Sequence, residues 1–339
     1  MSWRTRTYAG YVLPEALPLH AEPGDKIPPL TGLRLLTAWT FEPVLLAVIL
    51  LAGGLYLYGV HKLHKRGDSW SPGRTISFCG VGLGSAVIAT QSALGTYDTV
   101  LLSVHMVQHM ILSMLTPLAL AIGAPVTLAL RTMHGRPRKT LLAVLHSRVA
   151  KVLCFPLVGF VLFVFSPWAL YFSGWYEATL RNPFLHDLLH LHFVVVGALF
   201  FWPLLGLDPV PGRVMYPFRM LLVFLTLPFH AFLGVTIMSA NNLIAEDWYT
   251  SFGRSWPPSP LNDQYLAGGL LWGSGDIVGV VFFAVLFVQW FRESQREARR
   301  EDRRLDRLEE QARRARAAAP VASPRHQSPS RLDESDEHR

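Results

Sequence analysis

Long runs of apolar residues with few or no charged side chains recur along this chain. A helix needs about 20 mostly apolar residues to cross the hydrocarbon core of a bilayer. Because that core admits only helices or closed barrels, such runs predict an all-α integral membrane bundle of seven transmembrane helices. The segments are 35–60, 75–94, 99–121, 149–172, 184–206, 218–240 and 266–291.

The composition supports this class and argues against a nucleic-acid-binding protein. Only 16% of the residues are charged, whereas soluble domains carry about a quarter. The net charge of +7 comes from short loops and the C-terminal tail, where membrane topology explains it. Cys79 and Cys154 lie on different apolar segments and predict packing rather than a disulfide.

The distribution of Lys and Arg predicts an orientation. The loops after the first, third and fifth segments are basic, and the alternate loops carry only Arg181 and Arg254. Basic loops stay in the cytoplasm, so we expect the N-terminus outside and the C-terminus cytoplasmic. The chain then divides into an extracytoplasmic tail (1–34), a seven-helix domain (35–291) and a charged cytoplasmic tail (292–339) that is helical and then disordered.

Histidines interrupt three of the apolar segments. His105 and His109 lie one helical turn apart in SVHMVQHM, and His186 and His190 repeat that spacing in HDLLH. A fifth histidine, His230, lies in LPFH. Side chains at i and i+4 share a helix face, so each pair presents two imidazoles in one direction.

The five rings are predicted to form a layer in the outer half of the membrane. At about 1.5 Å of rise per residue, His105 and His109 lie about 9 and 15 Å below the outer boundary. The same rise gives about 3 and 9 Å for His186 and His190, and about 15 Å for His230. Any one ring alone fits a hydrogen bond between helices. Five at matching depth predict a metal site, because intramembrane polar residues are costly and imidazole is the commonest metal ligand.

The identity of the metal is open at this stage. Imidazole suits copper, zinc and iron, and outward-facing imidazoles with thioether neighbours favour Cu(I). Met106 and Met110 are candidate outer ligands, although methionines on an apolar helix are more typical of packing. Haem between axial histidines remains an alternative, as does zinc holding a hydrolytic water. A transporter is disfavoured because the inner halves of the segments contain few polar residues.

Four carboxylates accompany the histidines. Asp187 precedes His190 by three residues and is placed to orient that ring. Asp98 lies at the outer mouth of the third segment, and Glu42 and Asp276 fall at moderate depth in the first and seventh segments. Each is a candidate for a second ligand shell, and each is equally consistent with an ordinary hydrogen-bonded role.

Four blocks of sequence resemble the CtaG family of seven-span proteins, which is linked to assembly of caa3-type cytochrome c oxidase in bacteria. They are HMVQHMILSMLTPLALAIGAP, HDLLHLHFVVVGALFFWPLLGLDPVP, LPFHAFLGVTIM and DQYLAGGLLWGSGD. The resemblance covers about residues 35–291 and leaves both tails outside it.

The resemblance implies an assembly factor of the bacterial plasma membrane rather than an enzyme. Its implied task is to supply copper to the CuA centre on the outer face of the oxidase. The implied partners are the oxidase subunit that carries CuA and other copper chaperones, besides the lipid bilayer. The histidines of the matching blocks are the implied copper ligands: His105, His109, His186, His190 and His230. A haem-binding electron carrier and a zinc-dependent seven-span hydrolase remain the alternative functions.

Overall fold

The computed structural model describes residues 21–22, 25, 27–211 and 214–318, with side chains up to residue 314. Every regular element in this part of the chain is helical, and the β-pairing recorded there is one isolated bridge between Trp39 and Ser92. The predicted all-α class is confirmed. The expected N-terminal tail up to residue 20 and the expected disordered end from residue 319 lie outside the described residues.

The chain divides into two compact units, Met1–Phe287 and Val288–Arg339. The first holds the helical bundle and the beginning of the last helix, α16 (Pro260–Ala318). In the second unit α16 is highly charged, and acidic and basic side chains one turn apart form ion pairs, such as Arg314 with Glu310. Such pairs support a solvated helix.

Five helices or helical stretches are long and apolar enough to cross a membrane, and a bent pair makes a sixth candidate. The chain is therefore a multi-pass membrane protein. The bent pair turns by 71° between its two helices. The candidates are α2 (Pro43–His64), the stretch Leu102–Thr132, α13 (Pro183–Leu205), α14 (Tyr216–Ser239), the part of α16 up to Arg314, and α11 (Pro156–Tyr171) with α12 (Trp175–Arg181).

The stretch Leu102–Thr132 is not one uniform helix. It consists of α6 (Leu102–Met110), the π-helical η2 (Ile111–Leu115), α7 (Thr116–Ile122) and α8 (Pro125–Thr132). A π-helical turn holds an extra residue and is frequent at functional sites. Here it begins directly after the segment that carries the first histidine pair.

The second predicted segment, 75–94, is helical but is not among the candidate spans. It forms the consecutive elements α3 (Pro72–Thr75), η1 (Ile76–Leu83) and α4 (Gly84–Gln91). Its glycines and serines make it less apolar, and they allow close packing. A Cβ atom added to Gly82 would lie only 2.8 Å from Leu120 on α7. A total of seven spans stays a prediction.

The first span begins later than predicted. The segment expected at 35–60 divides into α1 (Gly32–Thr37) and α2, which starts at Pro43. Proline favours the first helical position because its fixed φ suits a helix and its missing N–H needs no partner there. Glu42 therefore precedes the span instead of lying inside it, and its backbone N–H donates to the Gln91 side chain.

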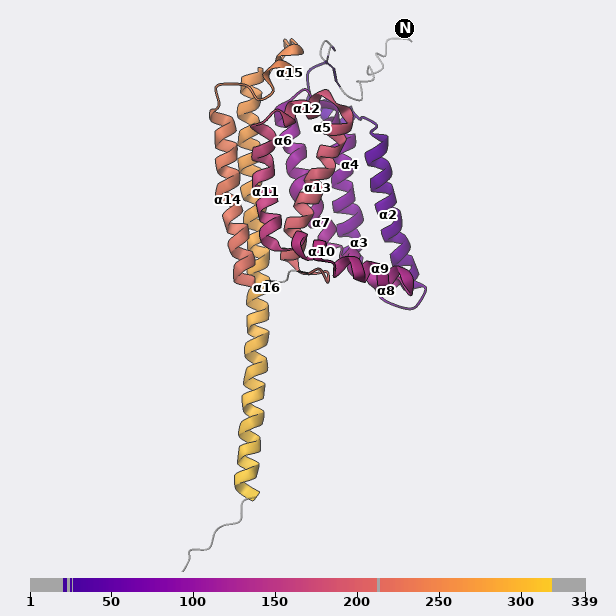
Figure 1. The fold of residues 1–339 in the computed structure, drawn as a ribbon, viewed down its shortest axis with the longest axis vertical. Helices are drawn as coiled ribbons and strands as arrows, with labels where there is room; N and C mark the ends of the chain where they lie inside the picture. Colours follow the sequence, from indigo (N-terminus) through magenta and orange to yellow (C-terminus); the bar gives the residue numbers. More distant parts are fainter. Residues whose placement is uncertain (1–20, 23–24, 26, 212–213, 319–339) are drawn as a thin grey trace, which may run out of the picture. The chain divides into compact units, whose positions relative to one another are not determined.

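Short helices and loops lie at the two ends of the bundle (Figure 1). One end carries α5 (Ala93–Tyr97), α12 and α15 (Glu246–Ser251), and we call it the α12 end. The other carries α8, α9 (Arg136–Leu145) and α10 (Arg148–Leu153), and we call it the α9 end. The α9 end gathers the basic loops after the first and third predicted segments, whose side chains meet through the Arg131–Asp68 ion pair. Its cytoplasmic location stays a prediction.

Contacts from distant parts of the chain fix the start of α6. The carboxylate of Asp263, at the beginning of α16, accepts hydrogen bonds from the backbone N–H of Leu102 and from the hydroxyl of Ser103. The indole of Trp248 in α15 donates to the carbonyl of Thr99 at 2.7 Å. Asp263 thus caps the helix that carries His105, and Trp248 holds the turn before it, both from elements that follow much later in the sequence.

Candidate metal centre

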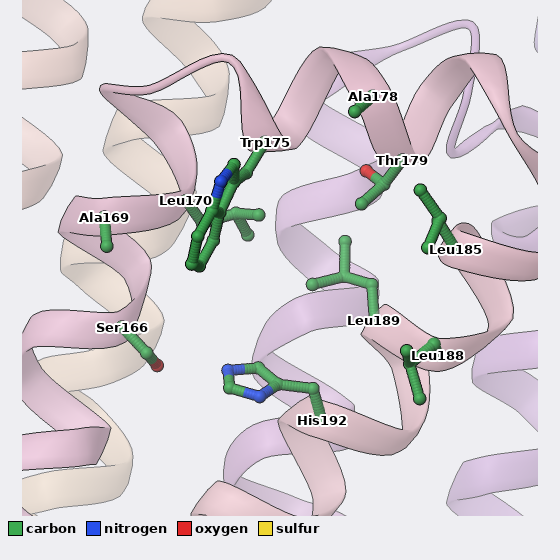
Figure 2. Close-up of a pocket in the computed structure, with 10 residues that line it drawn as sticks. All are labelled: Ser166, Ala169, Leu170, Trp175, Ala178, Thr179, Leu185, Leu188, Leu189 and His192. Carbon is green, nitrogen blue, oxygen red and sulfur yellow. The ribbon is translucent and has the colours of Figure 1, made fainter.

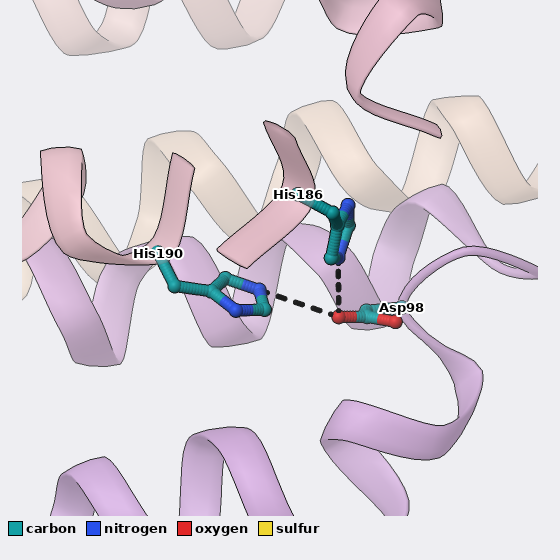
Figure 3. Close-up of side chains that lie close together, drawn as sticks. All are labelled: Asp98, His186 and His190. Atoms are coloured by element: carbon teal, nitrogen blue, oxygen red, sulfur yellow. Dashed lines mark hydrogen bonds and ion pairs between the residues drawn. The ribbon is translucent and has the colours of Figure 1, made fainter. Parts of the chain in front are cut away.

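Asp98 lies at the centre of the most concentrated group of metal-binding side chains in the described part of the chain. It follows α5 in the turn that leads to α6 and is 2% exposed. Its Oδ2 atom lies 2.9 Å from Nε2 of His186 and 3.4 Å from Nε2 of His190, both on α13 (Figure 3). The ligand atoms of the three residues, which we call the Asp98 cluster, lie within 4.8 Å of one another.

Gln108 of α6 holds the Asp98 cluster together. Its amide N–H₂ donates to Asp98 Oδ2 at 2.9 Å and to the carbonyl of Ala89 at 3.0 Å. Its carbonyl oxygen lies 2.9 Å from Nε2 of His190. Because an amide oxygen only accepts, this geometry requires the proton of His190 on Nε2. The other nitrogen, Nδ1, has no hydrogen-bond partner among the described residues.

Asp98 and the nearby Glu42 differ in their pKa values. Burial alone would raise the pKa of Asp98, but the facing imidazoles of His186 and then His190 hold it below its usual range. Burial raises the pKa of Glu42 to about 7, and the charges of Asp187 and Asp98 act in the same direction. Asp98 is therefore the carboxylate that stays ionised at neutral pH.

His105 and His109 both contact the hydroxyl of a tyrosine instead of the carboxylate of Asp98. The hydroxyl of Tyr171, at the end of α11, lies 3.0 Å from Nε2 of His105 and 2.8 Å from Nδ1 of His109. The ring of His109 also stacks on Phe193 with the ring centroids 4.0 Å apart. We call His105, His109 and Tyr171 the Tyr171 cluster. It is adjacent to the Asp98 cluster, because the ring centroids of His105 and His186 are 6.3 Å apart.

His230 lies apart from the other four histidines. Its Nδ1 hydrogen-bonds the carbonyl of Thr226 one turn earlier on α14, at 3.2 Å. Its ring packs beside Phe163 and against Gly275 of α16. None of the hydrogen bonds among the described residues joins it to either cluster, so the structure divides the predicted layer into two contiguous groups and one separate ring.

The other residues that the sequence predicted for the site lie in different surroundings. The ring of His190 contacts Gln108 and Asp98 through Nε2, and no hydrogen bond to Asp187 is described, so orientation of this ring by Asp187 stays a prediction. Asp276 accepts a hydrogen bond from Trp272 on its own helix. Met106 and Met110 belong to the buried hydrophobic core, as expected for packing side chains.

Sequence reasoning did not identify Gln108 or Tyr171. Gln108 carried a usable signal, because a polar residue inside an apolar span is costly and usually has a function. Tyr171 carried none, because an aromatic residue at the end of a span is typical of the membrane interface. The central place of Asp98 results from the turn after α5, which brings the carboxylate inward.

The Asp98 cluster has the donors and spacing of a metal site. Donor atoms at metal–ligand distances of about 2.0–2.2 Å lie about 3.3–3.6 Å apart around a tetrahedral ion. The Asp98–His186 and Asp98–His190 separations of 2.9 and 3.4 Å are close to these values, and the ligand atoms of the three residues lie within 4.8 Å of one another. Two imidazoles and a carboxylate suit divalent copper, zinc or iron. An ion binds an imidazole at Nε2 only after that nitrogen has lost its proton, so protonation of the rings competes with the ion.

Comparisons with known proteins place the chain in a family. It is 38% identical over 291 residues to uncharacterised proteins from Mycobacterium bovis and Mycobacterium tuberculosis, covering 84% of this chain and 42% of each relative. An uncharacterised protein from Mycobacterium leprae is 33% identical over 264 residues, covering 76% of this chain and 40% of the relative. The chain thus spans about two fifths of the length of the curated relatives it matches. No solved structure matches.

The family model that matches residues 54–293 describes the cytochrome c oxidase caa3 assembly factor, Caa3_CtaG. The match includes both clusters and His230, and it agrees with the resemblance seen in the sequence blocks. This chain belongs to the family of caa3-type cytochrome c oxidase assembly factors.

Proposed function

We propose that this protein handles copper during oxidase assembly and releases it to the subunit that carries the CuA centre. The observation that carries the proposal is the convergence of His186, His190 and Asp98 on one buried point. Membership in the assembly-factor family supports the oxidase as partner. Copper is the cargo, and the protein needs no chemical reaction to transfer it, because exchange of ligands suffices.

Each residue of the site has a distinct part in this proposal. His186 and His190 bind through Nε2 and Asp98 through Oδ2, in place of the hydrogen bonds that now join them. Gln108 fixes the carboxylate and the His190 ring before copper arrives. Among divalent ions, copper binds such nitrogen and oxygen donors most tightly. Protonation of the two rings restores the hydrogen-bonded network and favours release.

The Cu(I) state and a role for the Tyr171 cluster stay predictions. The Asp98 cluster lacks a sulfur donor, which favours the divalent ion there. Binding of copper to His105 and His109 requires the hydroxyl of Tyr171 to leave its place between the two rings. Paramagnetic resonance of the copper-loaded protein distinguishes the two oxidation states, because Cu(II) gives a signal and Cu(I) does not.

Metal analysis of the purified protein tests the proposed ligands. We expect copper in the wild-type protein and its loss in the double variant His186→Gln/His190→Gln. His192→Gln is the matched control, because this ring lies on the same helix but outside the Asp98 cluster. Elution as a monodisperse species in size-exclusion chromatography shows that each variant is folded. Unchanged copper content in the folded double variant would refute the site.

A second test addresses the partner. In cells that lack this protein, each variant is expressed and the CuA absorption of the isolated oxidase is recorded. We expect the double variant to yield an oxidase deficient in CuA, and excess copper in the medium to restore part of the signal. Normal CuA content in the absence of the protein would refute copper delivery and leave assembly itself as the function.

Zinc is the second candidate for the Asp98 cluster, because two histidines and a carboxylate are also the ligand set of hydrolytic zinc sites. Stoichiometric zinc after purification without added metal would favour a membrane hydrolase. Haem is disfavoured between these rings, because direct hydrogen bonds of 2.8–3.0 Å join them to Tyr171, Asp98 and Gln108. A Soret band in the absorption spectrum of the purified protein would favour haem binding.

A further inference from the structure

A cavity of about 380 Å³ lies between α11, α12 and α13, on the side of α13 away from the Asp98 cluster. Its walls are mostly apolar, with Leu170, Leu188 and Leu189 among them, and the exposed indole of Trp175 lies at its rim (Figure 2). The volume is in the range of small-molecule pockets, about 300–1,000 Å³. Because α11 and α13 belong to candidate spans and the lining residues Trp175 and Leu188 are exposed, we expect the cavity to open toward the bilayer.

Besides Thr179, whose hydroxyl donates to the carbonyl of Tyr176, two polar side chains line this apolar cavity. His192 extends from α13 toward α11, where the hydroxyl of Ser166 lies on the facing wall (Figure 2). Neither side chain makes a hydrogen bond to another described residue. In the hydrocarbon region no water satisfies such groups, so an unpaired donor is costly there. A ligand with a hydrogen-bonding group removes this cost.

The depth of His192 restricts the chemistry of the ligand. It lies nine residues after Pro183, where α13 begins, which corresponds to about 13 Å along the helix axis. A phospholipid headgroup stays at the interface and does not reach this level. The polar group that meets His192 must therefore belong to a molecule that dissolves in the hydrocarbon region.

We propose that this cavity binds a membrane quinone, a flat ring with carbonyl or hydroxyl oxygens on an apolar tail. A ring oxygen accepts from, or donates to, the imidazole of His192, and the hydroxyl of Ser166 serves a second oxygen. The indole of Trp175 offers a flat apolar surface to the ring. The tail leaves through the opening toward the lipid. This site is separate from the proposed copper site and does not depend on it.

Binding is measured with the protein in phosphatidylcholine nanodiscs, titrated with decylubiquinone and followed by quenching of tryptophan fluorescence. We expect a saturable component that exceeds the quenching from quinone dissolved in lipid, and its loss in Trp175→Phe. His192→Phe keeps an aromatic ring but removes the hydrogen bond, so the affinity should fall roughly five- to thirtyfold. Ala169→Phe fills the cavity and should abolish the saturable component.

Val195→Ala is the matched control, because Val195 is exposed on α13 three residues after His192 but does not line the cavity. It should bind like the wild-type protein. Purely linear quenching in the wild type, or unchanged affinity in both His192→Phe and Ala169→Phe, would overturn the proposal. Copper content is measured on the same samples and should be unchanged in His192→Phe, so failure of one proposal is distinguishable from failure of the other.

Discussion

The imidazole of His186 donates to the carboxylate of Asp98 over 2.9 Å, although 88 residues separate the two in the sequence. The pair joins α13 to the turn before α6 in the bundle interior. Without His186, Asp98 would lose one charge-assisted hydrogen bond but keep the one from Gln108, so the expected cost is about 1–3 kcal/mol.

We therefore expect His186→Ala to lower the free energy of unfolding by about 1–3 kcal/mol. The measurement is unfolding of the metal-free protein in mixed micelles of mild and denaturing detergent. His192→Ala, on the lipid-facing side of the same helix, should cost much less. If the two variants lose equal stability, the Asp98–His186 pair does not contribute as proposed.

The variant Tyr171→Phe should distinguish the role of the Tyr171 cluster from the role of the Asp98 cluster. The substitution removes the hydroxyl that both His105 and His109 contact and leaves their nitrogens without that partner. We expect a loss of about 1–3 kcal/mol in unfolding free energy. Copper content should stay unchanged, because the Asp98 cluster is intact. Tyr58→Phe is the control, since Tyr58 is 64% exposed. Loss of copper in Tyr171→Phe would move the copper site to His105 and His109.

Asp263→Ala should destabilise the start of α6. The carboxylate caps the backbone N–H of Leu102, and removing a helix cap costs about 0.5–2 kcal/mol. The expected readouts are a lower melting temperature and faster hydrogen exchange at the beginning of α6. Asn262→Ala, at the exposed neighbouring position, serves as the control. Equal exchange in both variants would show that α6 does not depend on this cap.

The raised pKa of Glu42 predicts a pH-dependent difference in stability. Its folded-state pKa of about 7 lies above the ordinary value of 4.5, so the folded state binds the proton more tightly than the unfolded state. Its contribution to stability is therefore present below pH 4.5 and is lost as pH rises through about 7. Glu42→Gln stays neutral, so its melting temperature relative to wild type should rise between pH 5 and pH 8. A constant difference would contradict the assignment.

The apolar runs predict the helical class because a long uncharged stretch has few alternatives in a bilayer. They do not predict where helices begin, since Pro43 delays the first span and the apolar residues before it form separate structure. The glycine-rich second segment shows that hydropathy alone does not decide whether a helix spans the membrane. It is helical except at Ser92, where the backbone is extended, yet its small residues reflect close packing as much as membrane location.

The histidine spacing predicts which rings share a helix face but not which faces meet. That choice depends on the rotation of α6, α11 and α13 about their axes, which bonds to distant residues set. The hydroxyl of Tyr171 contacts the two histidines on α6, and the carboxylate of Asp98 contacts the two histidines on α13. His230 lies at a suitable depth, but Phe163 and Gly275 surround its ring. Depth alone therefore cannot assign a common site.

The cap that Asp263 provides for α6 has a consequence for the order of biogenesis. Asp263 lies 161 residues after Leu102, so the ribosome delivers the cap long after α6 has entered the membrane. Until the last helix inserts, the polypeptide contains Asp98, His186 and His190 but lacks the contact that fixes the start of α6, the helix that carries Gln108. A truncated or stalled nascent chain thus contains every proposed copper ligand but lacks a contact that helps to position Gln108, which hydrogen-bonds Asp98 and His190.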